Sequence, residues 1–343
     1  MMGFVAKTIG IDLGTSNTLV YVKKKGIVIN EPTIVVVDVR NEKRVCAVGD
    51  EAKILMGRVT EGVMAVRPMK DGVITDIEMT QILLEYFIKK AIGSSYLFKP
   101  TVFLSYPCAI SAVERKAVSE ATRMAGAKKV YMIEKPFLAA HGSGLKVFEP
   151  SGNVIVDVGG GTTDVAVISL GGIVISNSIR VGGVRMDEAI INYIKQEFNL
   201  LIGDRTAEEI KLDLGAALPL RDERYAHIRG RDMVTNLPQT AKITSTHVYE
   251  AIHEPCMAIL ETIKRVIERT PPELVADIMH NGIHLTGAGA LLYGFDQFIA
   301  SELGIPVKLS KEPMDCAVLG LGNIIEDFDA LKSIGRTGFI KQV

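Results

Sequence analysis

Two segments of the chain carry the same pattern of apolar strand, polar turn and second strand. The first spans residues 11–18, where Ile-Asp-Leu leads into Gly-Thr-Ser-Asn-Thr, and the second spans residues 156–163, where Val-Asp-Val leads into Gly-Gly-Gly-Thr-Thr. A β-rich run follows each turn, at residues 19–22 and 165–168. Because two such runs joined by a short turn pair as a hairpin, the sequence predicts two copies of one hairpin.

Strand and helix patterns alternate through the rest of the first half. Ser111 and Glu114 have the spacing of a capping box, which predicts where one helix begins. The expected elements, from apolar and β-branched runs and from apolar residues at helical spacing, are sheet at 26–39, a helix at 79–92, a strand at 101–107, a helix at 111–126 and a strand at 129–133. This alternation is typical of the α/β class.

The second half repeats this plan. The expected elements are the hairpin at 154–179 and helices at about 186–198, 206–214 and 245–270. Pro271 and Pro272 end the long helix. Residues 283–290 then lead from a strand through a tight turn into a helix, a geometry that points backbone amides at an anion or a ribose. We therefore expect two pseudo-equivalent halves with a ligand between them.

The turns of the two hairpins have the composition of phosphate-binding loops. Glycines let the backbone approach a phosphate, and successive N–H groups form an anion site to which Thr and Asn add donors. A carboxylate would repel phosphate unless a cation stood between them, so Asp12 and Asp157 are expected to face a hydrated Mg²⁺. The alternative is two ordinary hairpins with Gly-rich turns, but two copies in register favour a duplicated clamp on one nucleotide.

Composition excludes several classes of protein. The 343 residues carry 39 basic and 40 acidic side chains, a formal charge of −1, and no long basic run, so no nucleic-acid partner is expected. The four cysteines lack metal-ligand spacing, which indicates reduced thiols in a cytosolic protein. No apolar run reaches the roughly 18 to 20 residues that span a bilayer, and the N-terminal segment is too short for a signal peptide.

These motifs resemble the superfamily of actin, DnaK-type chaperones and sugar kinases, and the match narrows to the MreB/Mbl family of filament proteins. The resemblance covers essentially the whole chain. Besides the hairpins, the segments that carry it are RPMKDGVI at 67–74, DRTAE at 204–208, RGRD at 229–232, TPPEL at 270–274 and PMDC at 313–316. A hairpin alone would indicate only the superfamily, whereas this combination is specific to MreB-like proteins.

The resemblance implies an α/β actin-like ATPase fold, with two duplicated lobes, each a mixed sheet with flanking helices, and ATP or ADP with Mg²⁺ in the cleft between them. The implied subdomains are IA (1–32, 68–147 and 319–343), IB (33–67), IIA (148–182 and 256–318) and IIB (183–255). Nucleotide closes the lobes of such proteins, and the closed subunits polymerise into protofilaments. The expected partners are therefore copies of the same chain and MreB paralogues.

The resemblance also implies the site residues. Phosphates would contact Gly14, Thr15, Ser16 and Asn17 of one turn and Gly159, Gly160, Gly161 and Thr162 of the other, while Asp12 and Asp157 hold the Mg²⁺ shell. Glu208 and Lys211 would cradle adenine and ribose, beside an adenosine turn formed by Gly287, Ala288 and Gly289. From the residues alone, an exposed helix ion pair is the preferred interpretation of Glu208 and Lys211.

The chain departs from the family at the catalytic acid. Members usually carry Ile-Glu-Glu-Pro, whose second acid positions and deprotonates the attacking water, but residues 133–136 read Ile-Glu-Lys-Pro. A lysine has three donors and no acceptor, so Lys135 can neutralise phosphate but cannot take a proton at neutral pH. We expect a weak ATPase in which Glu134 and Thr162 recover part of the rate. The alternative is that Glu134 serves in a shifted register and the ATPase is ordinary.

Two further departures touch the same site. An acidic residue that the family carries near the metal is replaced within Gly-Gly-Val-Arg-Met-Asp at 182–187, and the adenosine turn has Ala288 in place of a glycine. The added methyl crowds the ribose only if Ala288 needs a positive φ. These changes favour retained ATP binding with reduced turnover.

The loop at 93–99 matches the place where the family inserts a hydrophobic loop into the inner leaflet. Tyr96, Leu97 and Phe98 are its apolar residues, and Lys99 follows them. We therefore expect a cytoplasmic protein that lies peripherally at the inner face of the cell membrane and controls cell shape. The alternative is that Leu97 and Phe98 begin the core strand.

Other functions fit less well. A DnaK-type chaperone needs a substrate domain after its ATPase core, and a sugar kinase is normally longer and needs a catalytic Asp for which no clear candidate exists. The closer competitors are a nucleotide-gated scaffold without catalysis and a motility or helicity filament subunit of a wall-less cell.

Overall fold

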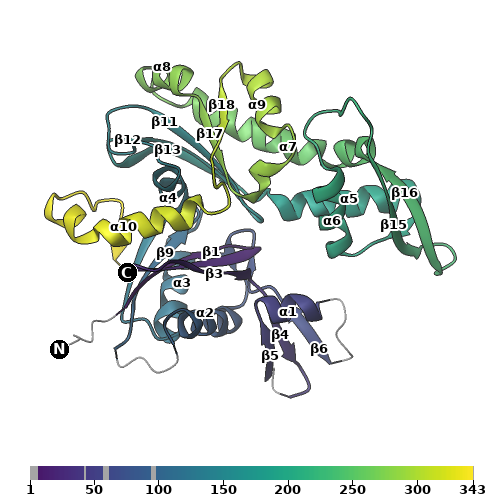
Figure 1. The fold of residues 1–343 in the computed structure, drawn as a ribbon, viewed down its shortest axis with the longest axis horizontal. Helices are drawn as coiled ribbons and strands as arrows, with labels where there is room; N and C mark the ends of the chain where they lie inside the picture. The colour runs from purple at the N-terminus through teal and green to yellow at the C-terminus, as the bar shows by residue number, and fades with distance from the viewer. Residues whose placement is uncertain (1–6, 42–43, 57–61, 94–97, 343) are drawn as a thin grey trace.

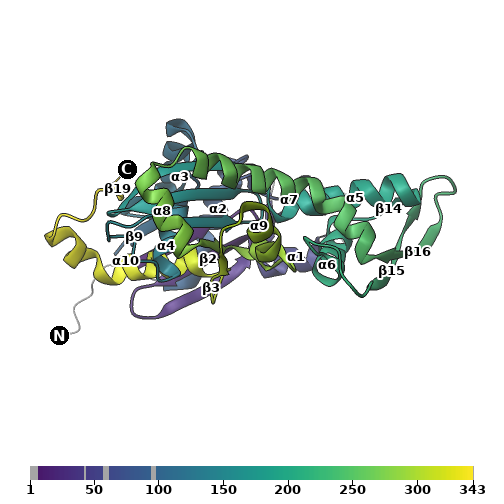
Figure 2. The same cartoon turned by 90° about the horizontal axis from the view of Figure 1, so that it is seen from above.

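The structure is a computed structural model that describes residues 7–41, 44–56, 62–93 and 98–342. Two α/β lobes lie one above the other in Figure 1, and each carries a smaller sheet on the same side. Figure 2 shows the long helix α7 (Ser245–Glu268) running along the upper lobe toward its smaller sheet. The two halves and the two hairpins predicted from the sequence are therefore present.

The first lobe is built on a mixed sheet that contains the first hairpin. The strand order is β19 (Lys341–Gln342), β10 (Lys129–Glu134), β9 (Thr101–Tyr106), β1 (Thr8–Leu13), β2 (Asn17–Val22) and β3 (Gly26–Pro32). β1 pairs antiparallel with β2 and parallel with β9. The helices are α2 (Ile77–Ile92), α3 (Ala112–Met124), α4 (Lys135–Gly142) and α10 (Cys316–Ser333). The predicted capping box of Ser111 and Glu114 is present at α3.

The second lobe repeats this topology. The strand order is β13 (Gly172–Ile179), β12 (Thr163–Ser169), β11 (Asn153–Val158), β17 (Ile283–Thr286) and β18 (Val307–Leu309). β11 pairs antiparallel with β12 and parallel with β17, as β1 does with β2 and β9. Besides α7, the helical segments are α8 (Pro272–Asn281), the 3₁₀ turn η1 (Ala288–Leu291) and α9 (Phe295–Leu303).

The smaller sheets differ from each other. The first has the order β5 (Arg44–Val48), β4 (Val35–Asp38) and β6 (Val63–Val66), beside α1 (Asp50–Leu55). The second has β14 (Leu200–Leu201), β15 (Tyr225–Asp232) and β16 (Pro238–Thr244), with α5 (Gly183–Phe198) and α6 (Asp204–Leu214). A short hairpin joins β7 (Met69–Lys70) to β8 (Val73–Ile74). The sheet expected at 26–39 is divided, because β3 and β4 belong to different sheets. The subdomain boundaries stay a prediction.

One apolar cluster connects the lobes. It contains Phe137 and Leu138 of α4, Ile155 of β11 and Leu321 of α10. α4 and α10 approach backbone to backbone, because a Cβ at Gly320 would overlap the carbonyl of Leu138. This close contact fixes the start of α4, which lies at the cleft described next.

Candidate functional site

The turns of the two hairpins face each other from opposite lobes. Each turn is closed by an equivalent backbone bond, from Gly14 N to Asn17 O at 3.1 Å and from Gly159 N to Thr162 O at 2.9 Å. A Cβ at Gly160 would overlap the hydroxyl of Ser16 across the cleft. The glycines therefore let two chains of backbone amides approach closely, as a phosphate site requires.

Behind these turns lies a cleft of about 570 Å³ between the lobes. The predicted residues that line it are Asp12, Gly14, Thr15, Ser16, Asn17, Lys135, Asp157, Gly159, Gly160, Gly161, Thr162, Glu208, Lys211, Gly287, Ala288 and Gly289. Segments that are far apart in the sequence thus meet at one site. Its size and its mixture of apolar walls with a few polar groups are typical of a small-molecule site.

Lys211, at one end of the cleft, has a different partner from the one expected from the sequence. Its ammonium lies 2.7 Å from an Asp187 carboxylate oxygen and donates to the Gly183 carbonyl at 3.0 Å. The ion pair thus joins α6 to α5, whereas the sequence suggested a pair with Glu208 on the same helix. Burial raises the pKa of Asp187 and the charge of Lys211 opposes that shift. Asp187 follows Met186 in the segment at 182–187, which the sequence showed to differ from the family pattern. The pairing of Asp187 with Lys211 was not visible in the sequence.

Ala288 lies at the start of η1, outside the left-handed region. Among the described residues, Ala288 is not one of the non-glycine residues that have a positive φ. Gly287 does have a positive φ of 84°, and a Cβ there would overlap the Val158 carbonyl. The turn therefore depends on Gly287, and Ala288 fits without backbone strain.

An apolar shelf, which was not predicted from the sequence, lies at this end of the cleft. Its members are Leu212, Leu291, Tyr293 and Met314, which are 74%, 50%, 60% and 53% exposed. Leu291 and Tyr293 stand in one apolar run of the sequence, Leu212 and Met314 lie far from it, and only the fold gathers the four beside the turn at 287–289. Exposed apolar surface inside a cleft is suited to a flat, weakly polar ring.

The two predicted metal ligands are buried at the base of the cleft. Asp12 accepts a hydrogen bond from the Ser105 hydroxyl. Asp157 accepts one from Thr286 at 3.1 Å. These hydroxyls fix one oxygen of each carboxylate and leave Asp12 Oδ2 and Asp157 Oδ2 directed at a third group.

That third group is the ammonium of Lys135, the first residue of α4. Lys135 Nζ lies 3.2 Å from Asp157 Oδ2 and 3.7 Å from Asp12 Oδ2. Burial alone would lower the pKa of Lys135, but the carboxylates of Asp12, Asp157 and Asp164 outweigh burial and raise the pKa above its usual value. Lys135 is therefore a fixed positive charge.

Asp164 adds a third carboxylate behind the pair. It is fully buried directly opposite Asp157 in the hairpin register and accepts bonds from Cys108 N at 3.1 Å and Thr162 Oγ1 at 3.3 Å. Burial and the charge of Asp157 raise its pKa to about 6, against the opposing effect of Lys135. The base of the cleft is therefore acidic, and Lys135 is the cation that contacts its paired carboxylates.

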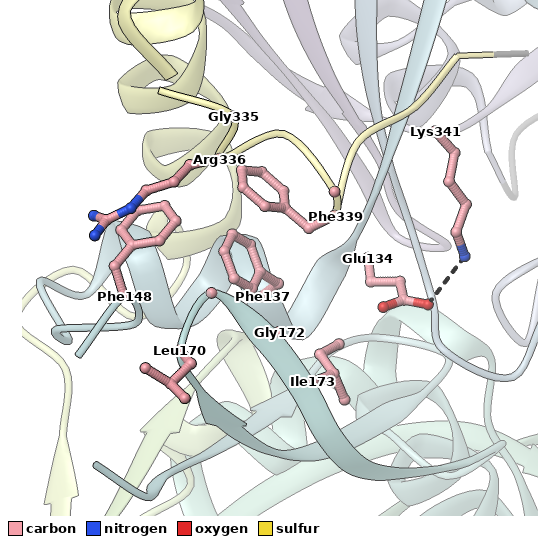
Figure 3. A pocket seen from close by; sticks show the side chains of 12 residues that line it. Glu134, Phe137, Phe148, Leu170, Gly172, Ile173, Gly335, Arg336, Phe339 and Lys341 are labelled. Carbon is pink, nitrogen blue, oxygen red and sulfur yellow. Dashed lines mark hydrogen bonds and ion pairs between the residues drawn. The ribbon is translucent and has the colours of Figure 1, made fainter. Parts of the chain in front are cut away.

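Glu134 is directed away from this cleft. It lines a separate pocket of about 480 Å³ together with Phe137, Phe148 and Phe339, and its carboxylate lies 3.5 Å from Lys341 Nζ (Figure 3). Adjacent residues at the junction of β10 and α4 point in different directions, as expected. The fold therefore brings Lys135 and Thr162 together and separates Glu134 from them.

The acidic pair suits Mg²⁺ only in part. Two carboxylates are the oxygen ligands that Mg²⁺ prefers. However, among the described residues no group of three or more His, Cys, Asp or Glu side chains is arranged to hold a metal ion. The ammonium of Lys135 already contacts both carboxylates. As arranged, these residues fit an ammonium, and Mg²⁺ fits only if Lys135 moves.

Sequence comparisons identify the family. The family model described as MreB/Mbl protein matches residues 6–333. The chain is 48% identical over 326 residues to the cell shape-determining protein Mbl of Bacillus cereus (strain ATCC 10987 / NRS 248), over 95% of this chain and 98% of that protein. It is 44% identical over 331 residues to the cell shape-determining protein MreB of Escherichia coli (strain K12), over 95% of both chains. The chain belongs to the MreB/Mbl family.

The structural comparison agrees with this MreB/Mbl assignment. The crystal structure of MreB 5 of Spiroplasma citri bound to AMPPNP is similar, with a TM-score of 0.91 at 34% identity, over 96% of this chain and 99% of that chain. The actin-like fold expected from the motifs is therefore confirmed. The protein is an actin-like member of a family of cell shape-determining cytoskeletal proteins.

The expected membrane loop falls largely on residues that the structure does not describe. Tyr96 and Leu97 lie outside the described residues. Phe98 is 53% exposed and precedes β9, which begins at Thr101. Phe98 therefore does not begin the core strand. In the described part of the chain, no helix has the length and apolar character needed to cross a bilayer.

Proposed function

We propose that this MreB/Mbl protein binds ATP and ADP in the interlobe cleft and polymerises into protofilaments that control cell shape. The observation that carries the proposal is the meeting of two Gly-rich turns, a lysine-bearing helix and an apolar shelf around one cleft. A related protein, MreB 5 of Spiroplasma citri, binds AMPPNP in its crystal structure. The expected partners are copies of this chain and MreB paralogues.

Different cleft residues are proposed to bind different parts of the nucleotide. The amides at 14–17 and 159–162 bind the phosphates from the two lobes, and the turn at 287–289 binds the adenosine. Glu208 and Lys211 contact the ribose and adenine, whose flat face packs on the apolar shelf. Because the phosphates contact both lobes, nucleotide binding favours the closed form. Closed subunits, each with the four proposed subdomains, then polymerise.

Hydrolysis is proposed to be slow. Attack on the terminal phosphate needs a group that accepts the proton of water, and Lys135 has no acceptor. The Thr162 hydroxyl donates a hydrogen bond to Asp164, and Glu134 contacts Lys341 and does not face the cleft. Loss of a general base lowers a rate by about 10²- to 10⁴-fold. Asp12 and Asp157 are the residues proposed to hold the shell of any Mg²⁺ that accompanies ATP.

A first experiment compares phosphate release during ATP-induced polymerisation by the wild type and by Lys135→Glu. We expect the variant to be faster by about tenfold or more, because it gains a proton acceptor. Lys129→Glu, at the exposed start of β10, is the matched control and should keep the wild-type rate. Equal rates for wild type and Lys135→Glu would show that another group activates water. Failure of ATP to induce polymerisation would exclude the proposed function.

The position of Lys135 also favours a second candidate function, a nucleotide-gated scaffold without catalysis. Such a scaffold could be a subunit of a motility or helicity filament in a wall-less cell. Both candidates bind ATP and polymerise, and they differ in turnover. Polymerisation by ATP without phosphate release over many hours would identify the scaffold. Measurable release that stops in Thr162→Ala would identify the slow ATPase.

We further propose that filaments lie peripherally at the inner face of the cell membrane, through the apolar residues Tyr96, Leu97 and Phe98. One loop binds a bilayer weakly, but a filament multiplies the contact. Sedimentation of filaments with liposomes tests this: the pair Leu97→Ser and Phe98→Ser should lose co-sedimentation. Val113→Ser, which alters a residue 79% exposed on α3, should not. Unchanged sedimentation of the loop variant would exclude this role.

A further inference from the structure

We propose that the Lys135 ammonium is a built-in counter-cation that lets this protein bind adenine nucleotide without a divalent metal ion. The inference rests on the proposed nucleotide function and deepens it. It follows from three properties of Lys135: its contact with two carboxylates, its place beside a phosphate turn and the rigidity of its helix.

The first property is the bridging contact. Lys135 Nζ is within 4 Å of Asp12 Oδ2 on β1 and of Asp157 Oδ2 on β11. These carboxylates come from equivalent positions in the two lobes, one at the end of each hairpin's first strand. A single ammonium therefore joins the lobes at the point where a hydrated cation was expected from the sequence.

The second property is the distance to the phosphate turn. A Cβ built on Gly159 would lie 3.8 Å from Lys135 Nζ, so the ammonium borders the turn whose amides face the phosphates. The proposed phosphate site therefore borders the same ammonium that contacts the carboxylates of Asp12 and Asp157. The ammonium stands between these two sets of negative charge and attracts both, which is the role that a metal ion has in phosphate sites.

The third property is that this lysine does not hang from a mobile segment. Pro136, Phe137 and Leu138, which follow it, are buried, and α4 packs backbone to backbone against α10. The Lys135 side chain is itself only 17% exposed. Because its position is fixed in advance, little freedom is lost when a phosphate binds.

A competing metal ion meets an unfavourable environment. Mg²⁺ between Asp12 and Asp157 would stand next to a buried ammonium of the same sign, and one of them would have to move. The charge of Lys135 therefore lowers the affinity of the cleft for divalent ions while it raises the affinity for phosphate. Metal-free and metal-bound nucleotide should then bind with similar strength.

Calorimetric titration with ATP tests this, in buffer with Mg²⁺ and in buffer with EDTA, using wild type, Lys135→Gln and the exposed control Lys129→Gln. Wild type and control should differ by less than about threefold between the two buffers, whereas Lys135→Gln should lose about tenfold or more in EDTA alone. Binding of ATP by wild type only with Mg²⁺ overturns the inference and leaves the proposed function intact. Absence of binding by wild type in both buffers overturns both.

A metal-binding measurement gives an independent readout. Mn²⁺ serves as a paramagnetic substitute for Mg²⁺, and its affinity for the ADP-loaded protein is measured by electron paramagnetic resonance. Lys135→Gln should bind Mn²⁺ about tenfold more tightly than wild type, because the competing ammonium is gone. Equal Mn²⁺ affinities would overturn the competition between lysine and metal.

Discussion

Lys211 on α6 forms a 2.7 Å ion pair with Asp187 on α5, and both side chains are largely buried at the edge of the interlobe cleft. The pair fixes an ammonium where ribose is proposed to bind. Asp187→Asn keeps the shape but removes the charge that orients Lys211, so ATP affinity should fall by about tenfold.

Calorimetry with ATP measures this effect, and Asp213→Asn, an exposed substitution on the same helix α6, is its control. Asp187→Asn and the control should unfold at the same temperature within about two degrees if the pair serves binding more than stability. Identical ATP affinity in all three proteins would contradict a role for the pair in the site.

The two Gly-rich turns, which we propose bind phosphate, approach so closely that a methyl group should separate them. A Cβ at Gly160 overlaps the Ser16 hydroxyl of the opposite lobe. Gly160→Ala should therefore block closure and lower ATP affinity by about tenfold or more. Ser16→Gly removes the overlapping atoms, so the double variant should recover part of the lost affinity.

Gly203→Ala is the control for the glycine substitution, because no atom of the described residues, apart from its chain neighbours, lies within 4 Å of a Cβ there and its φ is −93°. It should bind ATP like wild type. If Ser16→Gly does not improve the binding of Gly160→Ala, the loss arises from the turn itself and not from contact between the lobes.

The buried carboxyl of Asp164 should make the stability of the folded protein depend on pH. Burial and Asp157 raise its pKa from 3.8 to about 6 in the folded protein. Between about pH 4 and 6 the folded state therefore holds a proton that the unfolded chain has lost, and stability falls as pH rises through this window. Asp164→Asn lacks this titration, so its melting temperature should exceed that of wild type near pH 7 and approach it near pH 4.

Differential scanning calorimetry between pH 4 and 7.5 measures both curves. Lys135 opposes the upward shift of the Asp164 pKa, so Lys135→Gln should extend the falling part of the curve to higher pH. Parallel curves for wild type and Asp164→Asn would show that Asp164 is already ionised at low pH in the folded protein.

Local patterns predicted the parts of this site that depend on neighbouring residues. The two hairpin turns and the capped start of α3 follow from the order of Gly, Asp and Ser along the chain, since hairpins and caps are short-range structures. The residue pattern at 26–39 predicted one continued sheet, because β-rich segments on both sides of Asn30, Glu31 and Pro32 do not show by themselves that β3 and β4 belong to different sheets.

The contacts of Lys135 could not be predicted, because its partners lie on β1 and β11 and meet it only in the folded protein. The sequence showed an unusual charge and its chemical consequence for water activation. It did not show that the ammonium lies between Asp12 and Asp157. The pairing of Lys211 with Asp187 was missed for the same reason: a helical neighbour was visible in the sequence and a partner on another helix was not.

Thiol reactivity gives a test of the cysteine environments that the fold creates. Cys46 is exposed on β5, whereas Cys256 and Cys316 are buried. Burial raises the pKa of Cys256 to about 12 and that of Cys316 to about 11, and it also raises the pKa of Cys108, which keeps these thiols protonated. Since the thiolate is the reactive form, a disulfide reagent at pH 8 should modify Cys46 first.

The rapid phase of the reaction, followed by absorbance, should disappear in Cys46→Ser, and all four thiols of the wild type should react once the protein is unfolded in urea. Persistence of a rapid phase in Cys46→Ser would indicate that Cys108, which is half-buried beside Asp164, becomes accessible when the lobes open. Slowing of that phase by ATP would then report closure of the cleft, because Cys108 N donates to the Asp164 carboxylate on the opposite lobe.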